Sequence, residues 1–261
     1  MTTKIISILN FKGGTAKTTT VASVGSALAR KGHRTLLVDL DSQANLSECF
    51  GFEYDSSKPR TIFDAVVDGT GLPIYKENDN LFFVPSDMRL ANIEQKIAAD
   101  KDRSTRLRRL LEAAAAKEVF DFIIIDCPPA FGVGSTSALV ASDYAIIPME
   151  PTALPFSGMQ KMKAYADLAR TKNPKLDLLG IVFVRYRGTR NNREIIAKVN
   201  EEYPGLPFNT VIHENTTVAE AAGAKWDIIE YDPKSHGALD YMALTEELLH
   251  KIDNQNEKRI S

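Results

Sequence analysis

Two lysines, two glycines and a pair of threonines near the N-terminus have the types and spacing of a polyphosphate site. The run from Asn10 to Thr19 reads Asn-Phe-Lys-Gly-Gly-Thr-Ala-Lys-Thr-Thr, after an apolar stretch and before a segment with helical spacing. In a strand, glycine turn and helix arranged this way, backbone N–H groups converge on an anion and the helix dipole adds positive potential. Lys17 would then reach the outer phosphates, and the Thr18 hydroxyl would ligate Mg²⁺.

The run departs from the usual phosphate-loop pattern, in which Gly and four residues precede Gly-Lys-Ser/Thr. Phe11 occupies the first glycine position and Ala16 the second, where a methyl group restricts the backbone and crowds the phosphate cradle. Lys12 is an additional lysine that a generic phosphate loop does not need. An ordinary glycine-rich turn between strand and helix is the alternative. The residues predicted to bind the phosphates are Lys12, Gly13, Gly14, Thr15, Ala16, Lys17, Thr18 and Thr19.

Two acidic motifs that follow predicted strands are candidates for magnesium binding and catalysis. Asp41 lies in Asp-Leu-Asp-Ser-Gln, where it would order a water that attacks the γ-phosphate or hold a metal-bound water. Asp126 ends the run Phe-Asp-Phe-Ile-Ile-Ile-Asp, where a carboxylate polarises Mg²⁺ through water. Each aspartate has a plainer alternative as a turn or helix-cap residue. The predicted metal ligands are Thr18, Asp41 and Asp126, and the predicted catalytic residues are Lys12, Lys17, Asp41 and Asp126.

The elements that position these residues alternate between strand and helix. Apolar runs typical of buried strands occur at 4–10, 34–39, 80–85, 120–126, 144–148, 178–184 and 208–212. Helical segments are predicted at 18–31, 61–68, 89–99, 104–117, 157–171, 190–202 and 237–252. The alternation predicts an α/β fold, a mainly parallel twisted sheet with helices on both faces and ligands at the carboxyl ends of its strands. We expect a single domain over residues 1–252 and a polar, frayed tail at 253–261.

Composition and charge narrow the class of protein. The 261 residues are 44% hydrophobic and 25% charged, as is ordinary for a soluble globular protein. Because the formal net charge is only −2, DNA binding would need a local basic patch. Cys49 and Cys127 are too few for a disulfide framework, no signal peptide follows Met1, and no apolar run approaches the ~20 residues of a spanning helix. We therefore expect a cytoplasmic protein without membrane insertion.

Several blocks, taken in order, resemble the ParA/Soj group of DNA-segregation ATPases, within the MinD/ParA class of deviant Walker A P-loop proteins. Three of them read KGGTAKTT, LLVDLDSQANLS and FDFIIIDCPP, and further blocks extend the resemblance over essentially the whole chain. The resemblance implies a P-loop NTPase fold, ATP and Mg²⁺ as ligands, slow partner-stimulated hydrolysis to ADP and phosphate, and a homodimer formed on ATP binding. It also implies non-specific DNA binding, nucleoid association and a ParB-like or small adaptor protein as partner.

The resemblance further implies roles for single residues. Lys12 matches the signature lysine that crosses an ATP-sandwich dimer to touch the partner's nucleotide, and Thr19 matches a contact to the α-phosphate. Asp41 matches the switch I aspartate needed for hydrolysis. Asp126 matches the Walker B aspartate, and Pro128 follows it in switch II.

The C-terminal part departs from the family at positions linked to the base and to DNA. The loop expected to pack the adenine comprises His213, Glu214 and Asn215, and His213 stands where proline is usual. Glu214 and Thr217 stand where the segregation ATPases typically carry arginines linked to DNA binding, and a carboxylate repels phosphate. Other basic residues are available to rebuild a patch, although charged residues are usually solvated surface. Those predicted to contact DNA are Arg187, Arg190 and Lys225.

The leading hypothesis is an ATP-driven, dimerising partition ATPase that positions a plasmid, a chromosome region or other cargo through non-specific DNA binding. A MinD-like membrane-associated regulator would need a basic amphipathic C-terminal helix, whereas this chain ends in a polar tail. Three more hypotheses stay open: a cargo-positioning ParA relative with weakened DNA binding, a metabolic P-loop enzyme and a non-hydrolysing nucleotide-gated scaffold. Because only two cysteines occur, an iron-protein-like reductase is disfavoured.

Overall fold

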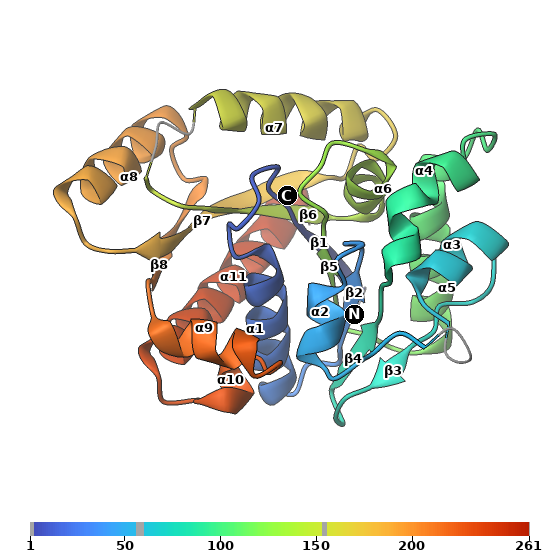
Figure 1. Cartoon of the computed structure of the whole chain (residues 1–261). Coiled ribbons are helices and arrows are strands. Elements are labelled where there is room, and N and C mark those ends of the chain that lie inside the picture. The colour runs from blue at the N-terminus through green and yellow to red at the C-terminus, as the bar shows by residue number, and fades with distance from the viewer. Residues whose placement is uncertain (1–2, 56–59, 153–155, 261) are drawn as a thin grey trace.

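The computed structural model describes residues 3–55, 60–152 and 156–260. A single sheet is covered by helices on both faces, as the alternation of strands and helices predicts (Figure 1). Its strands are β1 (Lys4–Ile8), β2 (Thr35–Asp39), β3 (Tyr75–Lys76), β4 (Leu81–Val84), β5 (Phe122–Asp126), β6 (Tyr144–Met149), β7 (Asp177–Tyr186) and β8 (Pro207–His213). Their order across the sheet is β3-β4-β2-β5-β1-β6-β7-β8. Among the described strands only β3, at one edge, runs antiparallel to its neighbour.

The helices lie on both faces of this sheet, and Figure 1 shows α7 over one face and α1 with α11 over the other. They are α1 (Lys17–Arg30), α2 (Asn45–Cys49), α3 (Ile62–Asp68), α4 (Ile93–Lys96), α5 (Arg106–Lys117), α6 (Val133–Ala141), α7 (Phe156–Arg170), α8 (Arg190–Glu202), α9 (Thr216–Gly223), α10 (Ile228–Tyr231) and α11 (His236–Ile260). Within the described ranges, every helix is too short or too polar to cross a membrane.

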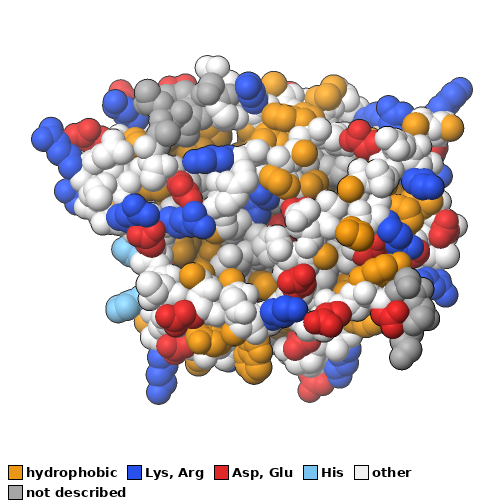
Figure 2. Space-filling view, viewed as in Figure 1, with side chains coloured by type: hydrophobic (Ala, Val, Ile, Leu, Met, Phe, Trp, Pro, Cys, Tyr) orange, Lys and Arg blue, Asp and Glu red, His pale blue; other side chains and the backbone are white. Residues whose placement is uncertain are grey.

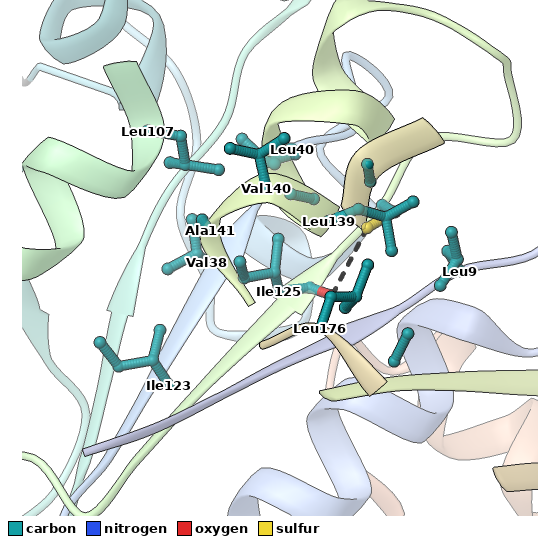
Figure 3. Packing of buried hydrophobic residues seen from close by; sticks show 14 of the residues in the cluster. Leu9, Val38, Leu40, Leu107, Ile123, Ile125, Leu139, Val140, Ala141 and Leu176 are labelled. Carbon is teal, nitrogen blue, oxygen red and sulfur yellow. Dashed lines mark hydrogen bonds between the residues drawn. The ribbon is translucent and has the colours of Figure 1, made fainter. Parts of the chain in front are cut away.

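Two apolar cores, one on each face of the sheet, explain the continuous apolar strands. Successive side chains of a strand point to opposite faces, so a strand that is apolar throughout needs cover on both. In β5, Ile123 and Ile125 belong to the core that includes residues of α5, α6 and α7, and Figure 3 shows them with Leu107 of α5 and Val140 of α6. Phe122 and Ile124 belong to the core on the other face, with residues of α1 and α11. The sheet is therefore covered on both faces, and the loops that follow its parallel strands lie at its carboxyl edge.

The predicted fold class is confirmed, and the differences lie in short or irregular elements. The predicted helix 89–99 is a 3₁₀ turn (Met88–Asn92) followed by α4, because the Asp87 carboxylate caps a tight turn by accepting from Arg89 N at 2.8 Å. The sequence did not indicate α2, α6, α9, α10 or β3. Of these, α6 is almost entirely buried, so it lacks the polar face from which helical periodicity is detected.

The prediction of a frayed tail was wrong for the described residues. Instead, α11 continues as far as Ile260, and Ser261 lies outside the described residues. The segment after Ile252 contains Gln255, Glu257, Lys258 and Arg259. These residues have favourable intrinsic helix propensity, so a helix already begun can extend through them without new apolar packing.

Candidate nucleotide site

The phosphate loop connects the end of β1 to the start of α1 at the centre of the carboxyl edge of the sheet. Gly14 has a φ of 75° and Ala16 a φ of 55°, so the chain passes twice through the left-handed region before α1 begins. A Cβ added at Gly13 or Gly14 would meet no atom within 4 Å. Open space beside glycine backbone at the N-terminus of a long helix is the arrangement that binds phosphate.

Ala16 keeps the backbone conformation that glycine would supply at this position. Its carbonyl accepts from the backbone N and the hydroxyl of Thr20 at 2.9 and 2.7 Å, which begins α1. An L-residue in the left-handed region costs about 1–2 kcal/mol. Such a conformation persists where the surroundings fix it, and here the buried Thr15 hydroxyl also donates to Lys12 O at 3.2 Å. The methyl group is therefore accommodated in a strained loop.

Asp126 is the buried carboxylate of the site, and one of its oxygens lacks a partner. It ends β5 in register with Ile8 of β1 and Asp39 of β2. Thr18 Oγ1 donates to Asp126 Oδ2 at 2.7 Å, while Oδ1 is buried without a hydrogen-bond partner in the described structure. Leaving a buried acceptor unsatisfied costs about 1–3 kcal/mol, and carboxylate oxygen is a ligand that Mg²⁺ prefers. Thr18 and Asp126 therefore fit a magnesium site.

A second buried aspartate, Asp39, lies on the neighbouring strand and was not predicted. Burial and the charge of Asp39 raise the pKa of Asp126 well above its usual range, although the Thr18 hydroxyl and the charge of Lys17 lower it. Burial also raises the pKa of Asp39 to about 6, although the backbone N and the hydroxyl of Ser47 donate to its Oδ2. Two adjacent buried carboxylates oppose each other's ionisation, and a divalent cation would relieve that. The available signal was an apolar strand ending in aspartate, as at Asp126.

Asp41 lies beside this buried pair in a local turn. Its backbone N donates to Asp39 Oδ1 at 3.0 Å, and its Oδ1 accepts from Gln43 N at 3.0 Å. Its charge raises the pKa of Asp126 and of Asp39. The described residues contain no group of three or more His, Cys, Asp or Glu arranged to hold a metal. Proteins bind Mg²⁺ through one or two carboxylates together with water and substrate phosphates.

The two lysines of the loop occupy different environments. Lys17 is only 7% exposed, and its charge lowers the pKa of the buried Asp126. The side chain of Lys12 is 64% exposed, and its Nζ lies 4.0 Å from Glu150 Oε2. One lysine therefore points into the site and the other lies at its surface.

An aromatic cluster links the phosphate loop to the segment after β5, which contains the half-buried Pro128. Phe11 stacks on Phe131 with ring centroids 3.4 Å apart, and both rings contact Tyr165 of α7 edge-on. The Tyr165 hydroxyl donates to Gly132 O at 2.9 Å and accepts from Gly132 N at 3.2 Å. The sequence does not indicate this connection, because its members are far apart in the chain.

A cavity of about 250 Å³ opens beside the first turns of α1, between α2 and α9. It adjoins the phosphate loop, since Thr18 and Thr19 line it. The predicted adenine loop lies just before α9: Asn215 caps that helix by accepting from Thr217 N at 2.8 Å. None of His213, Glu214 and Asn215 is among the residues that line the cavity. His213 instead pairs through Nδ1 with Asp240 Oδ2 at 2.9 Å.

The predicted DNA-contacting residues are each paired with a carboxylate. Figure 2 shows Lys and Arg interleaved with Asp and Glu on the face that it presents. The three ion pairs are Arg187–Glu214 at 2.6 Å, Arg190–Glu194 at 2.7 Å and Lys225–Glu53 at 3.3 Å. The described structure therefore does not gather these residues into a patch of unpaired positive charge.

Comparison with known proteins places this site in a family. Residues 3–178 match the family described as AAA domain. The chain is 34% identical to the sporulation initiation inhibitor protein Soj of Bacillus subtilis, covering 94% of this chain and 98% of Soj. It is 30% identical to the chromosome partitioning protein ParA of Caulobacter vibrioides, covering 98% of this chain and 97% of ParA.

The fold is also similar to solved structures. Cobyrinic acid a,c-diamide synthase of Mycobacterium smegmatis with bound ADP and magnesium is 29% identical, with a TM-score of 0.81 over 97% of this chain and 96% of the synthase. Because a shared fold can serve different reactions, function has to be argued from the site. The sequence relatives, the family match and the phosphate loop beside a buried aspartate agree. The chain belongs to the ParA/Soj family of P-loop ATPases.

Proposed function

We propose that the chain is a slowly hydrolysing ATP switch that dimerises when ATP binds and positions DNA or other cargo. The observation that carries this proposal is the bare, buried Oδ1 of Asp126 next to Thr18, at the end of an open phosphate loop. A buried carboxylate oxygen without a partner destabilises the folded chain, and a bound cation would offset its charge. We expect the cation to be Mg²⁺ carried in with ATP.

In the proposed mechanism, each residue of the site has one task. Backbone N–H groups around Gly13 and Gly14 bind the phosphates, and Lys17 neutralises their charge from inside the loop. Thr18 and Asp126 would hold Mg²⁺, which when bound would offset the charge that develops on the phosphates. Asp41 orients the attacking water. We place the nucleoside toward the cavity that Thr18 and Thr19 line, and the loop 213–215 leads into α9, which forms one wall of that cavity.

The exposure of Lys12 supports a role outside its own subunit. With its side chain 64% exposed, Lys12 is available to the nucleotide of a second copy. In an interface that excludes water, a lysine–phosphate contact is stronger than in solvent. Hydrolysis would then depend on dimerisation, and loss of the γ-phosphate would release the dimer. In this proposal the dimer alone hydrolyses ATP slowly, and we expect a ParB-like or small adaptor partner to stimulate it.

DNA binding in this proposal is weak and sensitive to salt. Arg187 is held by Glu214, so a DNA phosphate must compete with a carboxylate for the guanidinium. This pair favours a second candidate function, a cargo-positioning relative with weakened DNA binding.

Retention on a non-specific DNA duplex, measured across a salt series, separates the two candidates. Under the first, the wild-type chain is retained with Mg-ATP but not with Mg-ADP, and Lys17→Ala is not retained with either. Glu214→Gln frees Arg187 and should extend retention to higher salt, whereas Glu112→Gln, which breaks a pair with Arg108 on α5, should not. If the chain releases phosphate from ATP but neither it nor Glu214→Gln is retained at low salt, the DNA role is excluded and the second candidate stands.

A further inference from the structure

Glu150, directly after β6, is shared by two cations, one from the phosphate loop and one from β7. Its Oε2 lies 4.0 Å from Lys12 Nζ of the phosphate loop, and its Oε1 accepts from Arg185 Nη1 of β7 at 2.7 Å. The carboxylate side chain is 16% exposed, whereas those of Lys12 and Arg185 are 64% and 52% exposed. A carboxylate that is mostly removed from water needs a cation nearby, and here it has two.

The phosphate loop is fastened to the end of β6, which keeps Lys12 within reach of Glu150. Asn10 Nδ2 donates to Pro148 O at 2.6 Å, and Asn10 Oδ1 accepts from Lys12 N at 2.9 Å. The backbone of Lys12 is thus positioned from the strand that precedes Glu150. The two hydrogen bonds of Asn10 therefore keep Lys12 near Glu150.

Arg185 is aimed at Glu150 by an irregularity in β7. The register between β7 and β8 shifts between Phe183 and Tyr186, and Arg185 has a φ of 53°. A bulge of this kind re-aims a side chain. Because a non-glycine residue seldom adopts the left-handed region, such a conformation is maintained by its surroundings. The second cation on Glu150 is therefore held in place by the fold.

We infer that Glu150 is a positioning residue that holds Lys12 over its own subunit when no nucleotide is bound, and that Arg185 keeps Glu150 neutralised when Lys12 leaves. This inference rests on the proposed binding of Lys12 to a nucleotide phosphate. Two cations share one carboxylate, so removing Arg185 strengthens the hold on Lys12, whereas removing the charge of Glu150 releases it. The pair Lys12–Glu150 is partly exposed, which limits each effect to about two- to fivefold.

The test is the concentration of a non-hydrolysable ATP analogue that gives half-maximal dimer, measured by sedimentation with Mg²⁺ and without DNA. For Glu150→Gln we expect a concentration about two- to fivefold lower than for the wild-type chain. For Arg185→Gln we expect a shift of similar size in the opposite direction. Glu112→Gln, on the exposed surface of α5, serves as a matched control and should leave the value unchanged. Thermal unfolding of each variant verifies that it is folded.

Lys12→Ala distinguishes a failure of this inference from a failure of the proposed function. If Lys12→Ala dimerises as readily as the wild-type chain, or the wild-type chain does not dimerise, the proposed function fails. If Lys12→Ala is impaired but Glu150→Gln and Arg185→Gln leave the midpoint unchanged or shift it in the same direction, only the role of Glu150 is overturned. Opposite shifts, absent in Glu112→Gln, support that role.

Discussion

Replacing Asp126 by Asn should make the ligand-free protein more stable and abolish its magnesium-dependent ATPase activity. The asparagine side chain carries no charge, yet its amide oxygen can still accept from Thr18, as Asp126 Oδ2 does at 2.7 Å. The amide Nδ2 takes the place of the unpartnered Oδ1, so the expected gain comes from removing a buried negative charge whose ionisation burial and Asp39 oppose. A gain of about 2 kcal/mol corresponds to a rise in Tm of about 4–8 °C.

The pH dependence of this gain has a definite sign. Burial and the charge of Asp39 raise the pKa of Asp126 in the folded state. A raised pKa favours folding at pH values below the ordinary aspartate pKa of 3.8, and this stabilisation is lost as pH increases. The wild-type chain should therefore approach the stability of Asp126→Asn near pH 4 and fall below it at pH 7.5.

The assay is thermal or urea unfolding at both pH values, first with a chelator and then with Mg-ATP. Mg-ATP at a hundred times its Kd should stabilise the wild-type chain by about 2.7 kcal/mol and Asp126→Asn much less, so the order of stability reverses. Glu112→Gln, on the exposed surface of α5, removes a charge far from this pair and should change stability by less than about 0.5 kcal/mol. A ligand-free Asp126→Asn chain that is less stable than wild type at pH 7.5 would refute the reasoning.

Three further substitutions test other parts of the structure. Ala16→Gly removes the strain of an alanine in the left-handed region but increases the entropy of the unfolded chain. Urea unfolding should show a free energy of unfolding about 0.5–1 kcal/mol higher than that of wild type, and a lower value would contradict the strain. Burial raises the pKa of Asp227 to about 6, so ionising this carboxyl at neutral pH destabilises the folded chain. The free energy of unfolding of Asp227→Asn should equal that of wild type near pH 4 and exceed it by up to about 3 kcal/mol at pH 7. Equal pH profiles of the two proteins would count against this. Tyr165→Phe removes hydroxyl bonds to Gly132 and Thr136 but keeps the ring, and calorimetry should show a loss of about 1–2 kcal/mol; no loss would show that those bonds are not stabilising.

The sequence predicted the elements that carry a strong pattern. The run ending at Asp126 is apolar at every inward position on both faces, so its strand and its terminal acid were both predictable. The glycine turn before Lys17 was equally clear. Such features depend on short-range pattern, which one chain displays in full.

What the sequence did not predict depends on contacts between distant segments. Asp39 becomes important because the register of β2 on β5 sets it beside Asp126. Glu150 meets Lys12 and Arg185 only because β6 lies between β1 and β7 in the sheet. Neither arrangement leaves a periodic trace in the sequence, because strand order is a property of the folded chain.

The central claim is that ATP bound at this loop brings two chains together. Its most direct test is the mass of Asp41→Ala in solution by light scattering, with Mg-ATP and then with Mg-ADP, since the substitution should preserve bound ATP. The account predicts twice the mass of a single chain with ATP and a single-chain mass with ADP. The same mass with both nucleotides would contradict it.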